Sequence, residues 1–341
     1  MSSSGNAYAA EPAFPILAHT LLSSHTTAST IPEQQPDEPD QSSIWNLRKD
    51  IDEAFEDPSS VFRCGRVIGF SKLKKRAQED DDHDLIGQLP RYLLAKHLRN
   101  TTPSPQPKAF LIHPPTFDPF SPKQLLASLL ASPATPPPLS RNEAIALLDH
   151  VQLLPVFDFR AAVQAISQVA DALQSAAVST GEGKRESPRT LLLIAGLDTL
   201  TEDIIRASNP VKGAATLTAA LRTLTHISRA HGSHLAVMLV NTRGLGPARG
   251  FRPSAGGGVG AERQQILRGD FREDEGVYSM FHAETSTPLL PSLLMRTLDQ
   301  GIDTHVLLSM VKEDCVAEVI KDRVGEGVGK WCIWDEKSMN G

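Results

Sequence analysis

Hydrophobic and polar positions alternate in two ways along most of this chain. Short apolar runs, typical of strands buried on both faces of a sheet, are followed by segments whose apolar residues recur at three and four positions, typical of helices. The runs occupy residues 67–70, 109–112, 151–157, 191–194 and 235–240. Because strands that alternate with helices form parallel sheets, the pattern predicts an α/β fold with a mostly parallel central sheet flanked by helices on both faces.

Capping residues and apolar spacing mark the expected helices. They lie near 91–99, after the capping sequences at 121–124 and 140–143, after Asp158, and over 217–227. Beyond a long segment rich in glycine and arginine, the apolar period falls to two at 305–310, 316–320 and 331–334. These last segments predict C-terminal antiparallel strands that extend one edge of the sheet.

The chain divides into an extension and a core. Residues 1–42 are rich in Ser, Thr, Pro, Glu and Gln, and residues 1–60 as a whole are expected to form a largely disordered N-terminal extension. Apolar islands at 14–22 and 44–47 either pack against the core or dock a partner, and packing is the interpretation that we favour. Residues 61–341 are expected to form one core domain with a mobile loop at about 242–276.

Composition narrows the classes of function. The net charge of −6 provides no global positive field that would draw the chain onto nucleic acid, so any such contact must come from a local patch. Cys64, Cys315 and Cys332 have no CxxC spacing, which favours a reducing compartment and argues against a disulfide framework or a zinc site. No apolar run approaches the ~20 residues of a membrane span, and the N-terminus lacks the order of a signal peptide. We therefore expect a soluble, intracellular protein without a membrane partner.

The positions that would bind a nucleotide in such an architecture carry unsuitable residues. A phosphate-binding loop, G-x-x-x-x-G-K-[ST], should follow the first strand, because its main-chain N–H groups and its lysine neutralise the phosphates. The best alignment places Gly87 at the second glycine and leaves Gln88 and Leu89 in place of the lysine and the Mg²⁺-binding hydroxyl. Ala195 stands where an active enzyme carries the Mg²⁺-binding acid, and the nearest carboxylate that follows, Asp198, comes three residues later.

A third catalytic position is also empty. The run at 109–112 leads into His-Pro-Pro-Thr, which leaves no acid to orient an attacking water. With the lysine and both acids absent, we expect no hydrolysis of ATP. Lys74 and Lys75 are the alternative phosphate-binding residues of a displaced loop, although neither follows a glycine.

Five segments resemble, in order and spacing, the RecA-like recombinase family, and in particular the eukaryotic recombinase paralogues that act as recombination mediators. They are residues 64–71, 110–117, 192–198, 221–242 and the closing strands within 288–323. The resemblance implies a RecA-like P-loop-type core in which Asn241 is the polar sensor residue at the end of a strand. Because the family's P-loop is absent, it also implies a pseudo-ATPase that binds ATP and Mg²⁺ weakly or not at all. The vestigial nucleotide-binding positions would be Gly87, Gln88, Leu89, Ala195, Asp198 and Asn241.

The segment after Asn241 lies where this family has its mobile DNA-contacting loop. Arg243, Arg249 and Arg252 lie among glycines there, and flexible arginines suit sequence-independent contacts with the phosphates of single-stranded DNA. Acidic residues within 270–275 instead favour an ordinary solvated insertion. Phe-Arg-Ala-Ala at 159–162 matches the Phe-x-x-Ala oligomerisation pattern of recombinases, but its place at the start of a core helix makes packing the better interpretation.

The resemblance implies a non-catalytic subunit that supports homologous recombination and DNA repair in the nucleus, in a complex with a recombinase or other recombinase paralogues. Two alternatives stay open. One is a working DNA-dependent ATPase with a displaced P-loop, and the other is a RecA-fold scaffold outside recombination, as in assemblies that modify transfer RNA. Nucleotide affinity separates the first alternative from the main hypothesis, and the identity of the partners separates the second.

Overall fold

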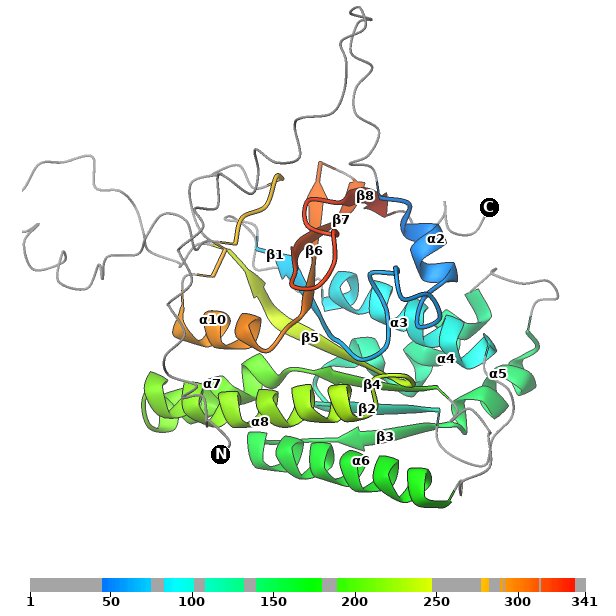
Figure 1. The fold of residues 1–341 in the computed structure, drawn as a ribbon, viewed down its shortest axis with the longest axis horizontal. Coiled ribbons are helices and arrows are strands. Elements are labelled where there is room, and N and C mark those ends of the chain that lie inside the picture. The colour runs from blue at the N-terminus through cyan, green and yellow to red at the C-terminus, as the bar shows by residue number, and fades with distance from the viewer. Residues whose placement is uncertain are drawn as a thin grey trace, which may run out of the picture. The chain divides into compact units, whose positions relative to one another are not determined.

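The computed structural model describes residues 45–74, 83–100, 108–131, 139–179, 189–246, 277–281, 289–290, 292–312 and 314–334. Within this part of the chain, an 8-stranded sheet has the order β3-β2-β4-β5-β1-β6-β7-β8 (Figure 1). The strands are β1 Val67–Leu73, β2 Ala109–His113, β3 Val151–Pro155, β4 Thr190–Ala195, β5 Leu235–Leu245, β6 Thr304–Val311, β7 Asp314–Asp322 and β8 Trp331–Trp334.

The sheet is mostly parallel. All neighbours from β3 to β6 pair in parallel, whereas β7 and β8 pair antiparallel at one edge. This confirms the predicted α/β fold, its central parallel strands and its C-terminal antiparallel strands.

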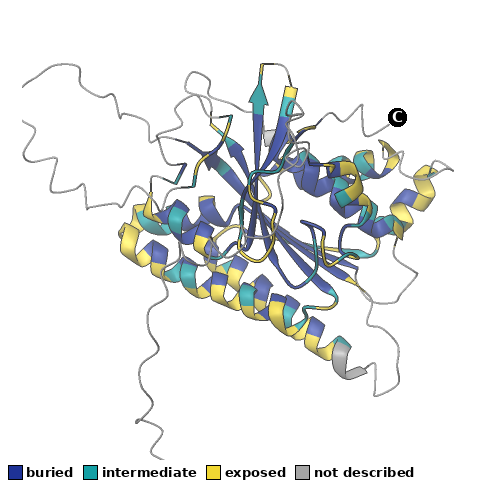
Figure 2. Ribbon diagram, turned by 45° about the horizontal axis from the view of Figure 1, so that its top comes forward, coloured by how far each residue is buried: buried dark blue, intermediate teal, exposed yellow. Residues whose placement is uncertain are grey.

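Helices cover both faces of the sheet (Figure 1). On one face, α2 Leu47–Asp52, α3 His83–Asn100, α4 Pro122–Ala131 and α5 Arg141–Leu148 pack onto the apolar cluster that includes Phe70 and Leu193. On the other, α6 Phe159–Ser179, α7 Leu197–Ala207, α8 Pro210–Ala230 and α10 Leu293–Gln300 pack onto the cluster that includes Val67 and Ile194. Figure 2 shows the buried residues concentrated in the strands and on the helix sides turned toward them.

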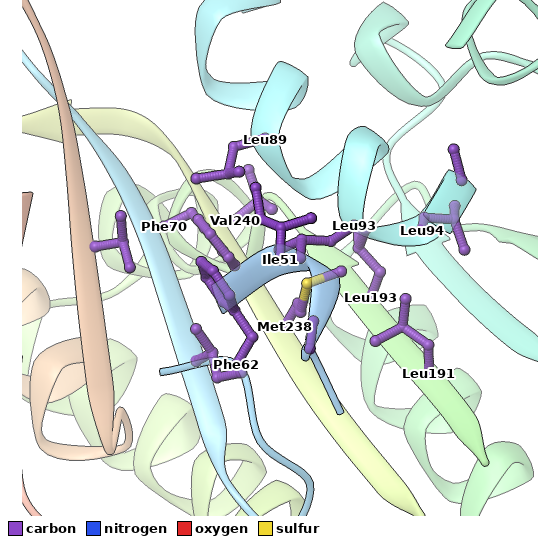
Figure 3. Packing of buried hydrophobic residues seen from close by; sticks show 14 of the residues in the cluster. Ile51, Phe62, Phe70, Leu89, Leu93, Leu94, Leu191, Leu193, Met238 and Val240 are labelled. Atoms are coloured by element: carbon purple, nitrogen blue, oxygen red, sulfur yellow. The ribbon is translucent and has the colours of Figure 1, made fainter. Parts of the chain in front are cut away.

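The neighbours β4 and β5 lie in the centre of the sheet, and every residue of β4 is buried. Their side chains alternate between the two clusters, since successive residues of a strand point to opposite faces. Figure 3 shows Leu191, Leu193, Met238 and Val240 beneath the leucines of α3. The expectation that the runs at 191–194 and 235–240 are strands buried on both faces is confirmed, and the structure makes them neighbours.

Helix α3 begins earlier than the sequence pattern indicates. It starts at His83 rather than near 91, so that Pro90 lies inside it. A proline in a helix interior removes one main-chain hydrogen bond and usually ends the helix. Here the buried side chains of Leu85, Ile86 and Leu89 before the proline continue the apolar face of Leu93 after it, and this packing holds the helix together.

Helix α7 was not expected from the sequence. It follows β4 without a linker, because Gly196 adopts a left-handed φ of 77° and turns the chain within one residue. A Cβ atom at Gly196 would also lie 2.8 Å from Cγ of Pro114, so only glycine fits beside the chain that follows β2. The three-residue η3 (Asp118–Phe120) comes after that proline segment.

The compact unit extends from Ser42 to Gly341, and so includes residues 45–60, which the sequence places in the extension. Trp45, Leu47, Ile51 and Phe62 are buried in the core, and the main-chain N–H of Trp45 donates to the carbonyl of Trp331 in β8 at 2.9 Å. This stretch therefore packs against the core, as we expected of an apolar island beside a domain. The island at 14–22 lies outside the described residues.

Candidate functional site at the carboxyl edge of the sheet

The carboxyl ends of β1, β4 and β5 lie side by side, because the three strands are parallel and β5 pairs with both others. Ser71 is opposite Asn241, and Ala195 is opposite Val240. Open α/β sheets bind ligands outside the carboxyl ends of their strands. The structure thus brings together Ala195, Asp198, Asn241 and Arg243, all predicted site residues, at the edge where a ligand would bind.

Gly87, Gln88 and Leu89 lie inside α3 and not in a loop that precedes it. Leu89 is 0% exposed and belongs to the core cluster near Val240 (Figure 3). A Cβ atom at Gly87 would lie 2.5 Å from Cβ of Pro119, so the glycine allows α3 to approach η3 closely. Gly87 and Leu89 therefore have packing roles, and Gln88, half-buried, lies between them.

Asp198 is 0% exposed and stabilises the end of β5. Its carboxylate accepts hydrogen bonds from the main-chain N–H of Arg243 at 2.8 Å and from Oγ1 of Thr242 at 3.1 Å. Burial raises the pKa of Asp198, and the hydrogen bonds from Arg243 and Thr242 oppose that rise. The acid that follows the expected Mg²⁺ position thus binds the protein's own main chain.

Asn241 takes part in a buried chain of hydrogen bonds. Its Nδ2 donates to Oγ of Ser71 at 2.8 Å, and Oγ of Ser71 bonds Nε2 of His305 at 2.8 Å. Nδ1 of His305 bonds Oδ1 of Asp299 at 3.0 Å, and Nζ of Lys321 donates to Oδ2 of Asp299 at 2.6 Å. These hydrogen bonds connect Asn241 to β1, β6, α10 and β7.

Ser71, His305 and Asp299 have the connectivity of a Ser-His-Asp triad, and the sequence analysis did not find them. Ser71 and His305 are fully buried in β1 and β6 under α10, where a substrate has no access. Burial raises the pKa of Asp299, but the hydrogen bonds from His305 and Lys321 outweigh it and hold that pKa below its ordinary value. This series of hydrogen bonds links strands structurally. Its sequence signal is a polar residue, Ser71 or His305, within a mostly apolar strand.

The described residues on either side of 247–276 lie close together. The main-chain N–H of Gly246 donates to the carbonyl of Leu289 at 3.3 Å, and the N–H of Leu289 donates to the carbonyl of Val277 at 3.0 Å. Buried Glu318 accepts from Oγ of Ser279 at 2.6 Å and from the N–H of Met280 at 2.9 Å. Glu318 is a second buried acid that holds this region, and no sequence motif pointed to it.

Of the three arginines that we predict to contact DNA, only Arg243 lies in the part of the chain that the structure describes. Strand β5 continues to Leu245, so it takes up the first residues of the expected mobile loop and places Arg243 on the sheet. The guanidinium of Arg243 pairs with Glu202 of α7, and Glu202 also pairs with Arg206 at 3.4 Å. Arg249 and Arg252 lie outside the described residues.

The Phe-x-x-Ala match lies in the described part of the chain. Phe159 and Ala162, in the first turn of α6, are buried in the core, which supports packing as the role of the Phe-x-x-Ala match. No group of three or more His, Cys, Asp and Glu side chains is placed to hold a metal ion among the described residues. Of the helices in these residues, none has the length and apolar character needed to cross a membrane.

The sequence was also compared with known proteins. It matches no family model, and a search of the curated proteins finds no significant match.

Proposed function

We propose that this chain is a non-catalytic RecA-fold subunit that supports homologous recombination and DNA repair in the nucleus, in complex with a recombinase or other recombinase paralogues. The observation that carries the proposal is the chemistry of the carboxyl edge. Leu89 is buried in the core, Ala195 has no polar side chain, and Asp198 is engaged by the main chain of β5. At this edge, which has the topology of a ligand site, Leu89 and Ala195 are thus packing residues at the positions where a P-loop enzyme carries its Mg²⁺-binding hydroxyl and acid.

The arrangement of the resembling segments supports the RecA-like part of the proposal. Segments 64–71, 110–117, 192–198 and 221–242 contain most of β1, β2, β4 and β5, and the closing segments contain parts of β6 and β7. All of these strands belong to one sheet. The segments that resemble the family therefore lie in one sheet, which is compatible with the proposed RecA-like core.

A test of the non-catalytic role is the turnover of ATP. We expect no hydrolysis above background with or without single-stranded DNA, and weak or absent binding of Mg²⁺–ATP by calorimetry, because the phosphate-binding lysine and the Mg²⁺ acid are missing. An Ala195→Asp variant is a useful companion, since restoring one acid without a P-loop should not restore turnover.

One outcome would favour the DNA-dependent ATPase instead. If DNA-stimulated turnover is measured and is lost in Lys74→Ala or Lys75→Ala, a displaced P-loop is present and the pseudo-ATPase proposal is wrong. Lys74 lies beside the site, where its main-chain N–H donates to the carbonyl of Leu245 at 2.7 Å.

The proposed DNA contact predicts a salt dependence. If Arg243, Arg249 and Arg252 neutralise phosphates of single-stranded DNA, affinity falls log-linearly with salt at roughly −0.7 per phosphate, and replacing all three by Ala makes the slope shallower by up to about three such steps. The thermal stability should change little, since Arg243 is 36% exposed on its side chain. Fluorescence anisotropy on the isolated chain, and again on the chain with its partner, measures the slope.

The identity of the partners separates recombination from other scaffolding roles. Affinity purification of the full chain from its source cell should recover a recombinase or another paralogue. Recovery of transfer-RNA-modifying proteins without a recombinase would support the RecA-fold scaffold outside recombination. An unchanged salt slope in the triple arginine variant would leave the scaffold role intact and remove the direct DNA contact.

A further inference from the structure

Glu202 of α7 occupies the space between two arginines. Its Oε2 contacts Nη1 of Arg243 at the end of β5, and its Oε1 lies 3.4 Å from Nη2 of Arg206 one helical turn later. The side chain of Glu202 is 21% exposed, so the carboxylate is partly shielded where it meets Arg243. The carboxylate of Glu202 thus occupies the position between two guanidinium groups where an anion from solution would bind if Glu202 were absent.

The main chain of Arg243 is fixed by hydrogen bonds to α7. Its main-chain N–H donates to the fully buried carboxylate of Asp198 at 2.8 Å, and Thr242 bonds both Asp198 and Thr199 of α7. The guanidinium therefore projects from a fixed strand end toward the surface. A cation presented on a rigid element binds an anion with less loss of side-chain freedom than one in a loop.

We propose that Arg243 and Arg206 form a binding site for a phosphodiester of single-stranded DNA, and that Glu202 is an intramolecular competitor that occupies this site when DNA is absent. The proposal rests on the DNA contact in the proposed function and adds its regulation. Guanidinium groups bind carboxylate and phosphate with the same planar geometry, so one group can replace the other. A partly exposed ion pair is weak enough for a polyanion to displace.

The chain offers a matched control one residue away. Asp203 pairs with Arg206 at 3.8 Å, and among the ion pairs of the described residues it has no contact with Arg243. Glu202→Gln and Asp203→Asn each remove one negative charge from the same surface of α7. The two variants therefore change the long-range electrostatic field in a similar way. Only Glu202→Gln also removes the ion pair with Arg243.

The test measures binding of a labelled thirty-nucleotide oligothymidylate to the full chain over a range of salt. Glu202→Gln should tighten binding about three- to fivefold at low salt, as expected when an exposed ion pair no longer competes, and Asp203→Asn should change it less than about twofold. In an Arg243→Ala background, Glu202→Gln should produce no such gain. Thermal unfolding of each variant shows that the fold is retained.

The outcomes separate this inference from the proposed function. Equal effects of Glu202→Gln and Asp203→Asn, or a gain that persists in Arg243→Ala, would overturn the competition while leaving the DNA contact in place. If neither the wild type nor any variant binds the oligonucleotide, the competition and the DNA contact are both wrong, and recovery of a recombinase partner still tests the scaffold role. Binding by Glu202→Gln alone would support the competition most directly.

Discussion

The Ile194→Asp variant is expected to be unfolded. Ile194 is 1% exposed, lies between Ile112 of β2 and Leu239 of β5, and belongs to the cluster under α6, α7 and α8. An ionised carboxylate placed there has no partner, and burying an unpaired charge costs several kcal/mol. Because a domain of this kind is stable by only about 5–15 kcal/mol, the substitution removes much or all of that margin.

Circular dichroism and urea unfolding measure this effect. Val211→Asp is the control, since Val211 is 71% exposed at the start of α8 and a surface charge there should change the free energy of unfolding by less than about 0.5 kcal/mol. Ile194→Val should lower stability by only about 1 kcal/mol, which follows from removing one buried methylene. A soluble Ile194→Asp variant with a cooperative transition would contradict the central position of β4.

The central strands were predictable because they are buried on both faces. Strand β4 is apolar at every position after Thr190, and a continuous run of Leu and Ile is a strong local signal. The period-two pattern of β8 is equally local, since this edge strand has one face toward the core and one partly exposed. In β7, by contrast, residues 316–320 are all buried, so its pattern does not reflect an exposed face. The burial of a strand's faces determines which of its positions are apolar, and this pattern can be recognised in the sequence.

The helices that were missed or misplaced depend on contacts that are distant in sequence. Helix α3 contains Pro90, and only its packing on the sheet explains why the helix continues through it. Helix α7 begins one residue after β4, where the left-handed Gly196 replaces the loop that a sequence pattern would show. Neither effect can be derived from periodicity. The continuation of α3 depends on its packing against the sheet, and the turn at Gly196 depends on the nearby Pro114, which is distant in sequence.

The site was predictable only in part for the same reason. The absence of a P-loop and of an acid at Ala195 can be read directly from the sequence. The roles of Asp198, Glu318 and Glu202 cannot be read in this way. An acidic residue gives the same sequence signal whether its carboxylate binds main-chain N–H groups, a metal or an arginine. Only the positions of Arg243 and Met280 beside these acids distinguish the three cases.

Replacing Asp198 by Ala is expected to lower the free energy of unfolding by about 1–3 kcal/mol. The change leaves the main-chain N–H of Arg243 without its buried acceptor, and an unsatisfied buried group costs about that much. The hydroxyl of Thr242 loses one partner but keeps its bond with Thr199. Asp203→Ala removes a carboxylate from the exposed side of the same helix, so its effect should stay within about 0.5 kcal/mol.

Mg²⁺ distinguishes this structural role of Asp198 from a metal-binding one. A ligand that binds only the folded state raises its stability, so a magnesium site would make the wild type more stable in Mg²⁺ and leave the Ala variant unaffected. We expect no such difference, because the carboxylate oxygens already accept hydrogen bonds from β5. Thermal unfolding of both proteins with and without Mg²⁺ provides the measurement. If Asp198→Ala were as stable as the wild type, and Mg²⁺ stabilised the wild type alone, Asp198 would be a metal ligand and the nucleotide chemistry of this edge would have to be reconsidered.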